Sequence, residues 1–151
     1  MLSEETRHAY AVKIAEFATL RFPVPRQLLL HTLLPMKERQ FRSNFTHNHT
    51  LSAGLRASPA ITGRARNYLA VFETEQDVRK LQPDMATLLR LDCLGIIATA
   101  PGENCDFVSR FFAPRAGVPE DPVTGSAHCT LIPYWAQRLG RTVLHARQLS
   151  P

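Results

Sequence analysis

The stretch EDPVTGSAHC, residues 120–129, brings two acids, two hydroxyl groups and an imidazole together within ten residues. Its Asp121 could transfer a proton, because a carboxyl group beside a reacting atom can act as a general acid or base. Ser126 precedes a run with helical character, so we predict that it caps the N-terminus of a helix. Gly125 would let the backbone approach a ligand closely or adopt a positive φ angle. His128 lies in the first turn and could add a hydrogen-bond donor.

The N-terminus of this predicted helix is the part that could bind a ligand. The first backbone N–H groups of a helix have no partner within the helix and lie at the positive end of its dipole. A loop that ends there is suited to a carboxylate or a phosphate. Pro122 favours an extended conformation for Asp121, which lies on the same loop. The pattern therefore favours an anion receptor beside a proton-transferring acid.

A purely structural interpretation explains the same residues. A serine before a helix is commonly only a cap, Asp-Pro commonly starts a turn, and His128 could simply pack in the interior. The chain lacks the phosphate-binding pattern GxxxxGK[ST] and the dinucleotide pattern GxGxxG. Ser126 does not lie in GxSxG, so we do not expect it to act as a nucleophile.

Composition places the chain among soluble globular proteins. Its 151 residues suffice for one domain with a core, and 44% are hydrophobic and 21% charged. No apolar run is long enough to span a membrane, and the first residues do not resemble a signal peptide. Three cysteines without CxxC spacing suit a reducing cytosol, so we expect a cytoplasmic protein without a metal site. The net charge of +5 has no basic run interleaved with aromatics, so we expect no nucleic-acid partner.

The elements that must position the loop are predicted from apolar periodicity. Apolar runs bounded by turn residues predict strands of one sheet at 67–72, 95–100 and 106–113, and a last strand near 142–149. A helix over 127–139 should pack on this sheet. Strands and helices alternate, which indicates an α/β or α+β domain. The buried stripe of the helix should consist of Leu131, Ile132, Trp135 and Leu139.

Shorter elements are predicted from capping residues and prolines. Thr74 should cap one short helix, and Asp84 should open another. Within residues 1–50, a helix whose periodic positions include Leu20 should end before Pro23. The rest of this segment has no sustained periodicity, so we expect it to be the least well packed part of the chain.

The same stretch carries a resemblance to a known family. The segment DFVSRFFAPRAGVPEDPVTGSAHCTLIPYWAQRLGR closely resembles the signature of the phenazine-biosynthesis, PhzF-like isomerases, and the similarity covers about residues 51–150. The resemblance implies a diaminopimelate-epimerase-like fold, in which a curled mixed sheet surrounds a helix. We therefore expect one α+β domain at 51–151, incomplete at its C-terminus, after a divergent leader at 1–50.

The resemblance also implies a chemistry and roles for residues. The family's best-known reaction shifts a proton on a cyclic hydroxy-amino acid and needs no metal and no organic cofactor. By this resemblance Asp121 is catalytic and assists proton transfer or orients the substrate amine. Gly125 and Ser126 hold the substrate, and His128 is a further substrate-binding residue. The expected ligand is a small cyclic or amino-acid-like carboxylate.

The chain departs from the family in its first half. The family's N-terminal general-acid/base glutamate has only Glu4 as a counterpart here, and its CGHAT loop has none beyond a weak similarity at 47–54. Two functions stay open. One is an isomerase, either inactive through truncation or completed by a homodimer or by another domain. The other is a non-catalytic small-molecule-binding or protein-interaction module.

Overall fold

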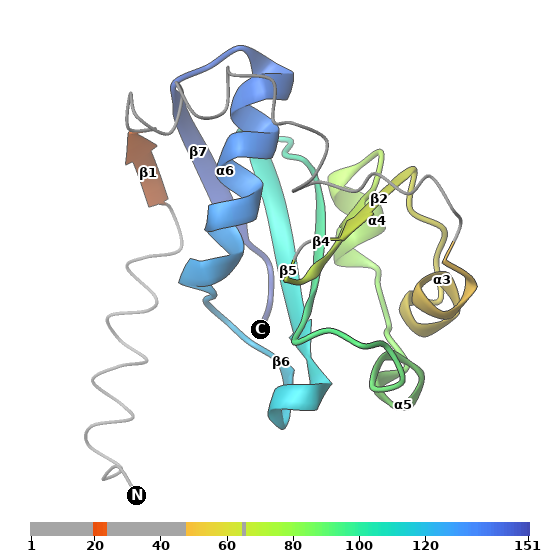
Figure 1. Cartoon of the computed structure of the whole chain (residues 1–151). Helices are drawn as coiled ribbons and strands as arrows, with labels where there is room; N and C mark the ends of the chain where they lie inside the picture. Colours follow the sequence, from red (N-terminus) through yellow and green to blue (C-terminus); the bar gives the residue numbers. More distant parts are fainter. Residues whose placement is uncertain (1–19, 24–47, 65) are drawn as a thin grey trace, which may run out of the picture.

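One mixed sheet organises the computed structural model, which describes residues 20–23, 48–64 and 66–151 (Figure 1). The described strands are β1 (Leu20–Pro23), β2 (Ile61–Arg64), β3 (Tyr68–Val71), β4 (Ile96–Pro101), β5 (Phe107–Ala113), β6 (Val118–Glu120) and β7 (Val143–Gln148). Their order is β1-β7-β5-β4-β3-β2, and β6 pairs with β5 beside this path. The β3–β4 and β5–β7 pairs are parallel and the others are antiparallel. The predicted α+β class, with its strands in one curled mixed sheet, is confirmed.

Helices cover both faces of this sheet (Figure 1). The described helices are α3 (His49–Leu55), α4 (Glu75–Arg79), α5 (Met85–Leu88), the 3-10 turn η1 (Pro114–Ala116) and α6 (Gly125–Leu139). Successive side chains of β4 point to opposite faces, so Ile96 packs with the α3–α5 side and Ile97 with the α6 side. Both faces of β4 and β5 are covered, so these strands are almost continuously buried and mostly apolar.

Helix α6 is fixed to the sheet by its buried tryptophan. The Trp135 indole N–H donates to Thr99 Oγ1 at 3.0 Å, and the Thr99 hydroxyl donates to the Val108 carbonyl at 2.7 Å. The Trp135 ring also stacks on Phe107, with ring centroids 5.7 Å apart. Because these bonds satisfy buried polar groups, they hold α6 in one position against β4 and β5. The first turn of α6 is thereby placed at one end of β5 and β7.

The predicted stripe of α6 is right at its centre and wrong at its end. Leu131 and Trp135 are fully buried, and Ile132 packs against the same cluster while partly buried. Leu139 is 37% exposed instead. It is the last helical residue, and Gly140 ends the helix there with φ 63°. The helix therefore ends beyond the part of the sheet that could cover Leu139.

The two predicted short helices are confirmed together with their caps. Thr74 accepts from the Asp77 N–H, and Asp77 in return accepts from the Thr74 N–H, which completes a capping box at α4. Asp84 accepts from the backbone N–H groups of Ala86 and Thr87 at α5. Neither helix is long, so tertiary packing supplies most of its stability.

The early part of the chain differs from the prediction where the structure describes it. Leu20 lies in β1, which pairs antiparallel with β7, so the predicted helix through Leu20 is wrong. Pairing with β7 supplies backbone partners that override helical spacing over so short a run. The predicted loose packing of residues 1–50 falls mostly on 1–19 and 24–47, which lie outside the described residues. The proposed boundary at residue 50 stays a prediction.

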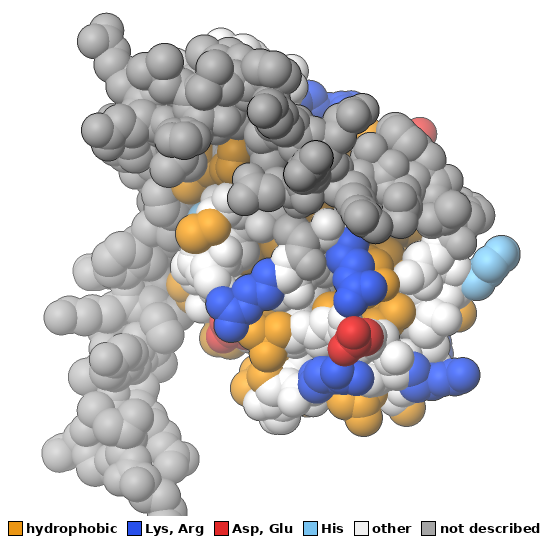
Figure 2. Space-filling model, viewed as in Figure 1, with side chains coloured by type: hydrophobic (Ala, Val, Ile, Leu, Met, Phe, Trp, Pro, Cys, Tyr) orange, Lys and Arg blue, Asp and Glu red, His pale blue; other side chains and the backbone are white. Residues whose placement is uncertain are grey.

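Two further features concern membrane-spanning helices and the distribution of surface charge. None of the described helices is both long and apolar enough to cross a membrane. On the described part of the face seen in Figure 2, Lys and Arg side chains are interspersed with hydrophobic and acidic ones. The expected lack of a nucleic-acid partner stays a prediction.

Candidate functional site

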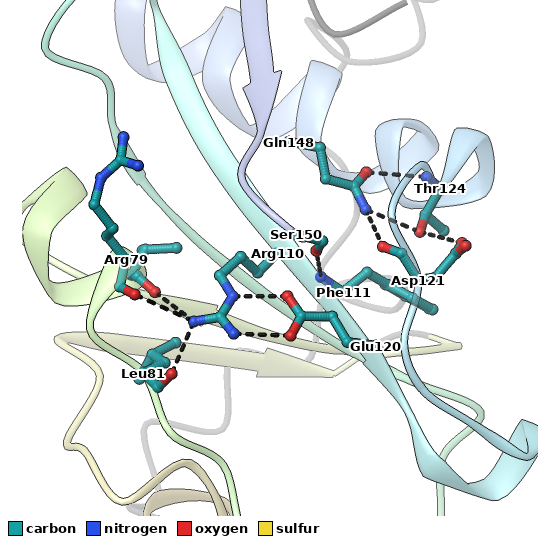
Figure 3. Close-up of polar contacts among 10 residues, drawn as sticks. Arg79, Leu81, Arg110, Phe111, Glu120, Asp121, Thr124, Gln148 and Ser150 are labelled. Atoms are coloured by element: carbon teal, nitrogen blue, oxygen red, sulfur yellow. Dashed lines mark hydrogen bonds and ion pairs between the residues drawn. The ribbon is translucent and has the colours of Figure 1, made fainter. Parts of the chain in front are cut away.

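The loop between β6 and α6 carries the residues that the sequence singles out. Asp121 directly follows β6, and its backbone N–H donates to the Phe111 carbonyl of β5 at 3.0 Å. The chain end lies on the same side, since the Ser150 hydroxyl accepts from the Phe111 N–H at 3.4 Å (Figure 3). Strand β5 therefore sets the position of the Asp121 backbone.

Thr124, not Ser126, occupies the N-cap position of α6, so the predicted cap is wrong by two residues. The helix begins at Gly125, and Thr124 has the extended conformation of a cap residue, with φ −119° and ψ 92°. Its side chain nevertheless makes no cap hydrogen bond. The Thr124 hydroxyl donates instead to Oδ2 of Asp121 at 2.6 Å. The first turn of α6 therefore lacks the side-chain acceptor that a cap normally supplies.

Gln148, at the end of β7, ties this loop together (Figure 3). Its Oε1 accepts from the Thr124 N–H at 2.9 Å, and its Nε2 donates to the Asp121 carbonyl at 2.6 Å. The same Nε2 also donates to Thr124 Oγ1 at 3.3 Å. The sequence assigns no role to Gln148, because no sequence motif marks a polar residue at the end of a strand as functional. We call Asp121, Thr124 and Gln148 the loop cluster.

An ion pair anchors the residue before Asp121. The Arg110 guanidinium forms two hydrogen bonds with the Glu120 carboxylate, at 2.7 and 2.8 Å, and their side chains are only 12% and 14% exposed. Arg110 Nη1 also donates to the backbone carbonyls at the end of α4, and the nearest, that of Leu81, is 2.8 Å away. Bidentate pairs of this kind are strong and directional. Glu120 is thus bound to Arg110, and it fixes the start of the loop.

Gly125 and Ser126 are exposed at the first turn of α6. Gly125 does not have a positive φ angle, and a Cβ built on it would meet no atom within 4 Å. The backbone therefore does not need glycine here, and the missing side chain leaves space at the first turn of α6. The exposed N–H groups and the helix dipole make this end attractive for a carboxylate.

His128 lies in the interior, beneath the loop rather than on its surface. It is 4% exposed, and its Nδ1 donates to the Thr124 carbonyl at 3.0 Å. Its ring also lies 6.4 Å from the Phe107 ring, between centroids. Burial lowers the pKa of His128, so the neutral imidazole is favoured. A direct role in substrate binding stays a prediction, and support of the loop is the role that these contacts favour.

Two open hollows lie elsewhere on the described surface. One of about 560 Å³ is lined by residues that include Arg56, Phe72 and Lys80. The other, of about 480 Å³, is lined by residues that include Cys105 and Arg147. Neither is lined by the loop cluster or by the start of α6. Among the described residues, no three His, Cys, Asp or Glu side chains gather as metal ligands.

The fold and this loop define a PhzF-type α+β domain. A solved structure of a PhzF-family phenazine biosynthesis protein from Enterococcus faecalis superposes with a TM-score of 0.66 and 44% identity, over 68% of this chain and 40% of that one. A PhzC/PhzF protein from Clostridium difficile gives a TM-score of 0.63 at 44% identity, over 67% of this chain and 39% of that one. The chain belongs to the phenazine biosynthesis-like protein family, because the PhzC-PhzF family model matches residues 20–149.

Curated relatives carry the same family character. An "uncharacterized isomerase" of Pseudomonas aeruginosa is 57% identical over 90 residues, which are 60% of this chain and 34% of that protein. Another protein so named, from Halalkalibacterium halodurans, is 39% identical over 120 residues, 78% of this chain and 45% of that protein. The human "phenazine biosynthesis-like domain-containing protein" is 53% identical over 62 residues, 37% of this chain and 22% of it. The chain thus spans less than half the length of these relatives.

Proposed function

We propose that the chain supplies the Asp121 side of a PhzF-like isomerase site, which shifts a proton on a small cyclic or amino-acid-like carboxylate without a cofactor. The isomerase names of the relatives and the family match support the reaction class. The observation that carries the proposal is the Thr124 hydroxyl, which donates to Asp121 and leaves the start of α6 uncapped. An acid and an anion receptor therefore lie on one short loop.

In this proposal the two parts of the loop act on one substrate molecule. The N–H groups of Gly125 and Ser126 donate to the substrate carboxylate. Asp121 accepts a hydrogen bond from the substrate amine, or takes a proton from the adjacent carbon. When a C–H bond breaks, its electron pair stays on the substrate, and the proton forms an O–H bond with Asp121. The electron pair then takes a proton from a second acid at another carbon, and exchange with solvent restores the protonation of both groups.

In our proposal, the second acid does not belong to this loop. Glu120 is bound to Arg110, and His128 is buried with its Nδ1 bonded to a carbonyl. We therefore propose that another domain or a second copy of the chain completes the site, in the cytoplasm. The same observation favours a second candidate function, a non-catalytic module that binds small carboxylates.

Proton exchange in heavy water tests the proposal. The chain is incubated with trans-3-hydroxy-L-proline, a cyclic hydroxy-amino acid, and deuterium incorporation at carbon is followed by NMR. We expect incorporation with the wild type and none with Asp121→Asn. Asp92→Asn is the matched control, because Asp92 is exposed and far from the loop in the sequence. Binding without incorporation would support the non-catalytic module, and equal incorporation by Asp121→Asn would remove Asp121 from the mechanism.

A further inference from the structure

The hydrogen bonds of Gln148 determine how its side-chain amide is oriented. The Thr124 N–H can only donate, so the Gln148 atom that faces it at 2.9 Å must be the oxygen. The nitrogen then faces the Asp121 carbonyl at 2.6 Å, which can only accept. One N–H of the amide is used there, and the other points to the Thr124 hydroxyl oxygen. The Gln148 amide therefore forms hydrogen bonds with the backbone at both Asp121 and Thr124.

This orientation also determines the direction of the Thr124 hydroxyl. Because Thr124 Oγ1 accepts from Gln148, its own single proton is left for Asp121. The 2.6 Å separation between Oγ1 and Oδ2 is in the range of a charge-assisted bond from a hydroxyl to a carboxylate. Donation thus runs in one direction, from Gln148 through Thr124 to Asp121. Thr124 is 6% exposed, so water competes little for this proton.

We propose that Thr124 and Gln148 are positioning residues that reserve Oδ2 of Asp121 as an acceptor and make Oδ1 the oxygen that meets the substrate. This inference deepens the proposed function and rests on it. Thr124 can donate to Oδ2 in both protonation states of the acid, provided that the acid proton resides on Oδ1. When a substrate C–H bond breaks, its electron pair and the negative charge stay on the substrate. The proton forms an O–H bond with Oδ1.

The same donation couples the acid to the anion receptor. A Thr124 hydroxyl turned toward the first turn of α6 would accept from a helix N–H group, and that N–H would then be unavailable to a ligand. By donating to Asp121, Thr124 serves the acid and leaves the first turn of α6 open to a ligand carboxylate. Gln148 favours this arrangement, because it fills one of the two acceptor positions of the Thr124 hydroxyl and binds the Thr124 N–H. The orientation of one amide at the end of β7 thus sets both parts of the proposed site.

Exchange of the Thr124 hydroxyl proton tests the arrangement without any ligand. In a mixture of H₂O and D₂O, a slowly exchanging hydroxyl splits the carbon-13 signal of its Cβ into two lines, whereas a fast one gives a single line. We expect two lines for Thr124 and one line for the exposed Thr142. Gln148→Leu should speed the exchange at Thr124 and merge its lines. A single Thr124 line in the wild type, or unchanged splitting in Gln148→Leu, would overturn the inference.

Deuterium incorporation into trans-3-hydroxy-L-proline tests the catalytic consequence. Thr124→Val keeps the side-chain shape and loses the hydroxyl, so its turnover should fall by about tenfold or more while half-saturation changes little. Thr124→Ser restores the hydroxyl and should recover most of the rate. Thr130→Val, on the same helix, is the matched control. Wild-type turnover by Thr124→Val would overturn the positioning role and leave the proposed function intact.

These two measurements also separate the inference from the proposed function. Absence of incorporation by the wild type would contradict the isomerase proposal, and the hydroxyl signal of Thr124 would then decide alone whether the directed arrangement exists. Two lines that merge in Gln148→Leu would support the arrangement even in a non-catalytic module.

Discussion

The Thr124 hydroxyl lies 2.6 Å from Oδ2 of Asp121 and not on the N–H groups of the helix that Thr124 starts. A threonine in this position commonly stabilises its helix as a cap, with a contribution of about 0.5–2 kcal/mol. Helix α6 forgoes that contribution and is held instead by Trp135 and Leu131 in the core. The helix therefore tolerates an open first turn, next to an oriented carboxylate.

Replacing Ser126 should show that it is not a cap. Ser126 is exposed and is the second residue of α6, so Ser126→Ala should change the free energy of unfolding by no more than about 0.5 kcal/mol. Asn48→Ala is the matched control, because Asn48 accepts from the Leu51 N–H at 3.1 Å and caps α3. That variant should cost about 1 kcal/mol. Urea unfolding of both variants gives the comparison, and a larger loss for Ser126→Ala would contradict the assignment of the cap.

Gly125→Ala should separate stability from ligand binding. The added Cβ meets no atom and the backbone has no positive φ angle, so stability should stay constant or rise by up to about 1 kcal/mol. Binding of acetate, followed by NMR shifts of the Ser126 amide, should weaken because the Cβ lies where the ligand approaches. Gly95→Ala is the contrasting variant for stability, since the Cβ that it adds would collide with the Phe111 ring. Undiminished acetate binding by Gly125→Ala would remove this residue from the anion receptor.

Arg110→Met should be strongly destabilising. It leaves the largely buried Glu120 carboxylate without its partner and removes a donor from the carbonyls of Val78 and Leu81. Removal of one partner from a pair this buried typically costs about 3–5 kcal/mol. Arg115→Met is the matched control, because the Arg115–Asp92 pair is exposed and should contribute at most about 1 kcal/mol. Similar unfolding midpoints for the two variants would show that the Arg110–Glu120 pair does not anchor the loop.

Stability should depend on pH through the buried His128. Burial lowers its pKa from the ordinary value of 6.5, so the unfolded chain binds a proton that the folded domain does not. The contribution of neutral His128 is therefore fully present above about pH 6.5 and is lost as the pH falls below it. The pKa of Glu75 is lowered mainly by the Glu103 N–H, so this group affects stability in a more acidic range, below pH 4.5.

Urea unfolding at about pH 7.5 and about pH 5.5 measures this dependence. We expect a smaller pH dependence in His128→Asn, whose amide can still donate to the Thr124 carbonyl. Ser126→Ala, which removes no titratable group from an exposed position, should keep the wild-type dependence. An identical pH dependence in the wild type and His128→Asn would contradict the buried neutral state.

Local patterns were sufficient to predict most of the fold. Apolar runs between turn residues located β3, β4 and β5 to within a residue or two at their ends, because these strands are buried on both faces. The caps of α4 and α5 were readable from Thr74 and Asp84, since capping acts within one turn. Leu20 was misassigned because its pairing with β7 joins residues more than a hundred positions apart, which no local pattern encodes.

The candidate site was predictable in its loop and not in its support. Asp121 and Gly125 stand out by residue type and because they lie close together in the sequence. Gln148 could not be found this way, because its contact with Thr124 joins residues 24 positions apart and depends on β7 lying beside β5. The change of cap from Ser126 to Thr124 has another origin, because α6 begins at Gly125, two residues before the predicted start. The hydroxyl that could cap α6 is drawn to a neighbouring carboxylate, and only the three-dimensional structure shows it.

Comparing the binding of two ring-shaped carboxylates tests most directly whether Asp121 and the start of α6 act on one ligand. L-proline and cyclopentanecarboxylate are similar in size and differ in the amine, and both should shift the NMR signals of the Gly125 and Ser126 amides in the wild type. Asp121→Asn should weaken proline binding because the amine loses its charged partner, and it should leave cyclopentanecarboxylate binding equal or tighter because a like charge is removed. Equal effects of Asp121→Asn on both ligands, or no shift of either amide with proline, would contradict the account.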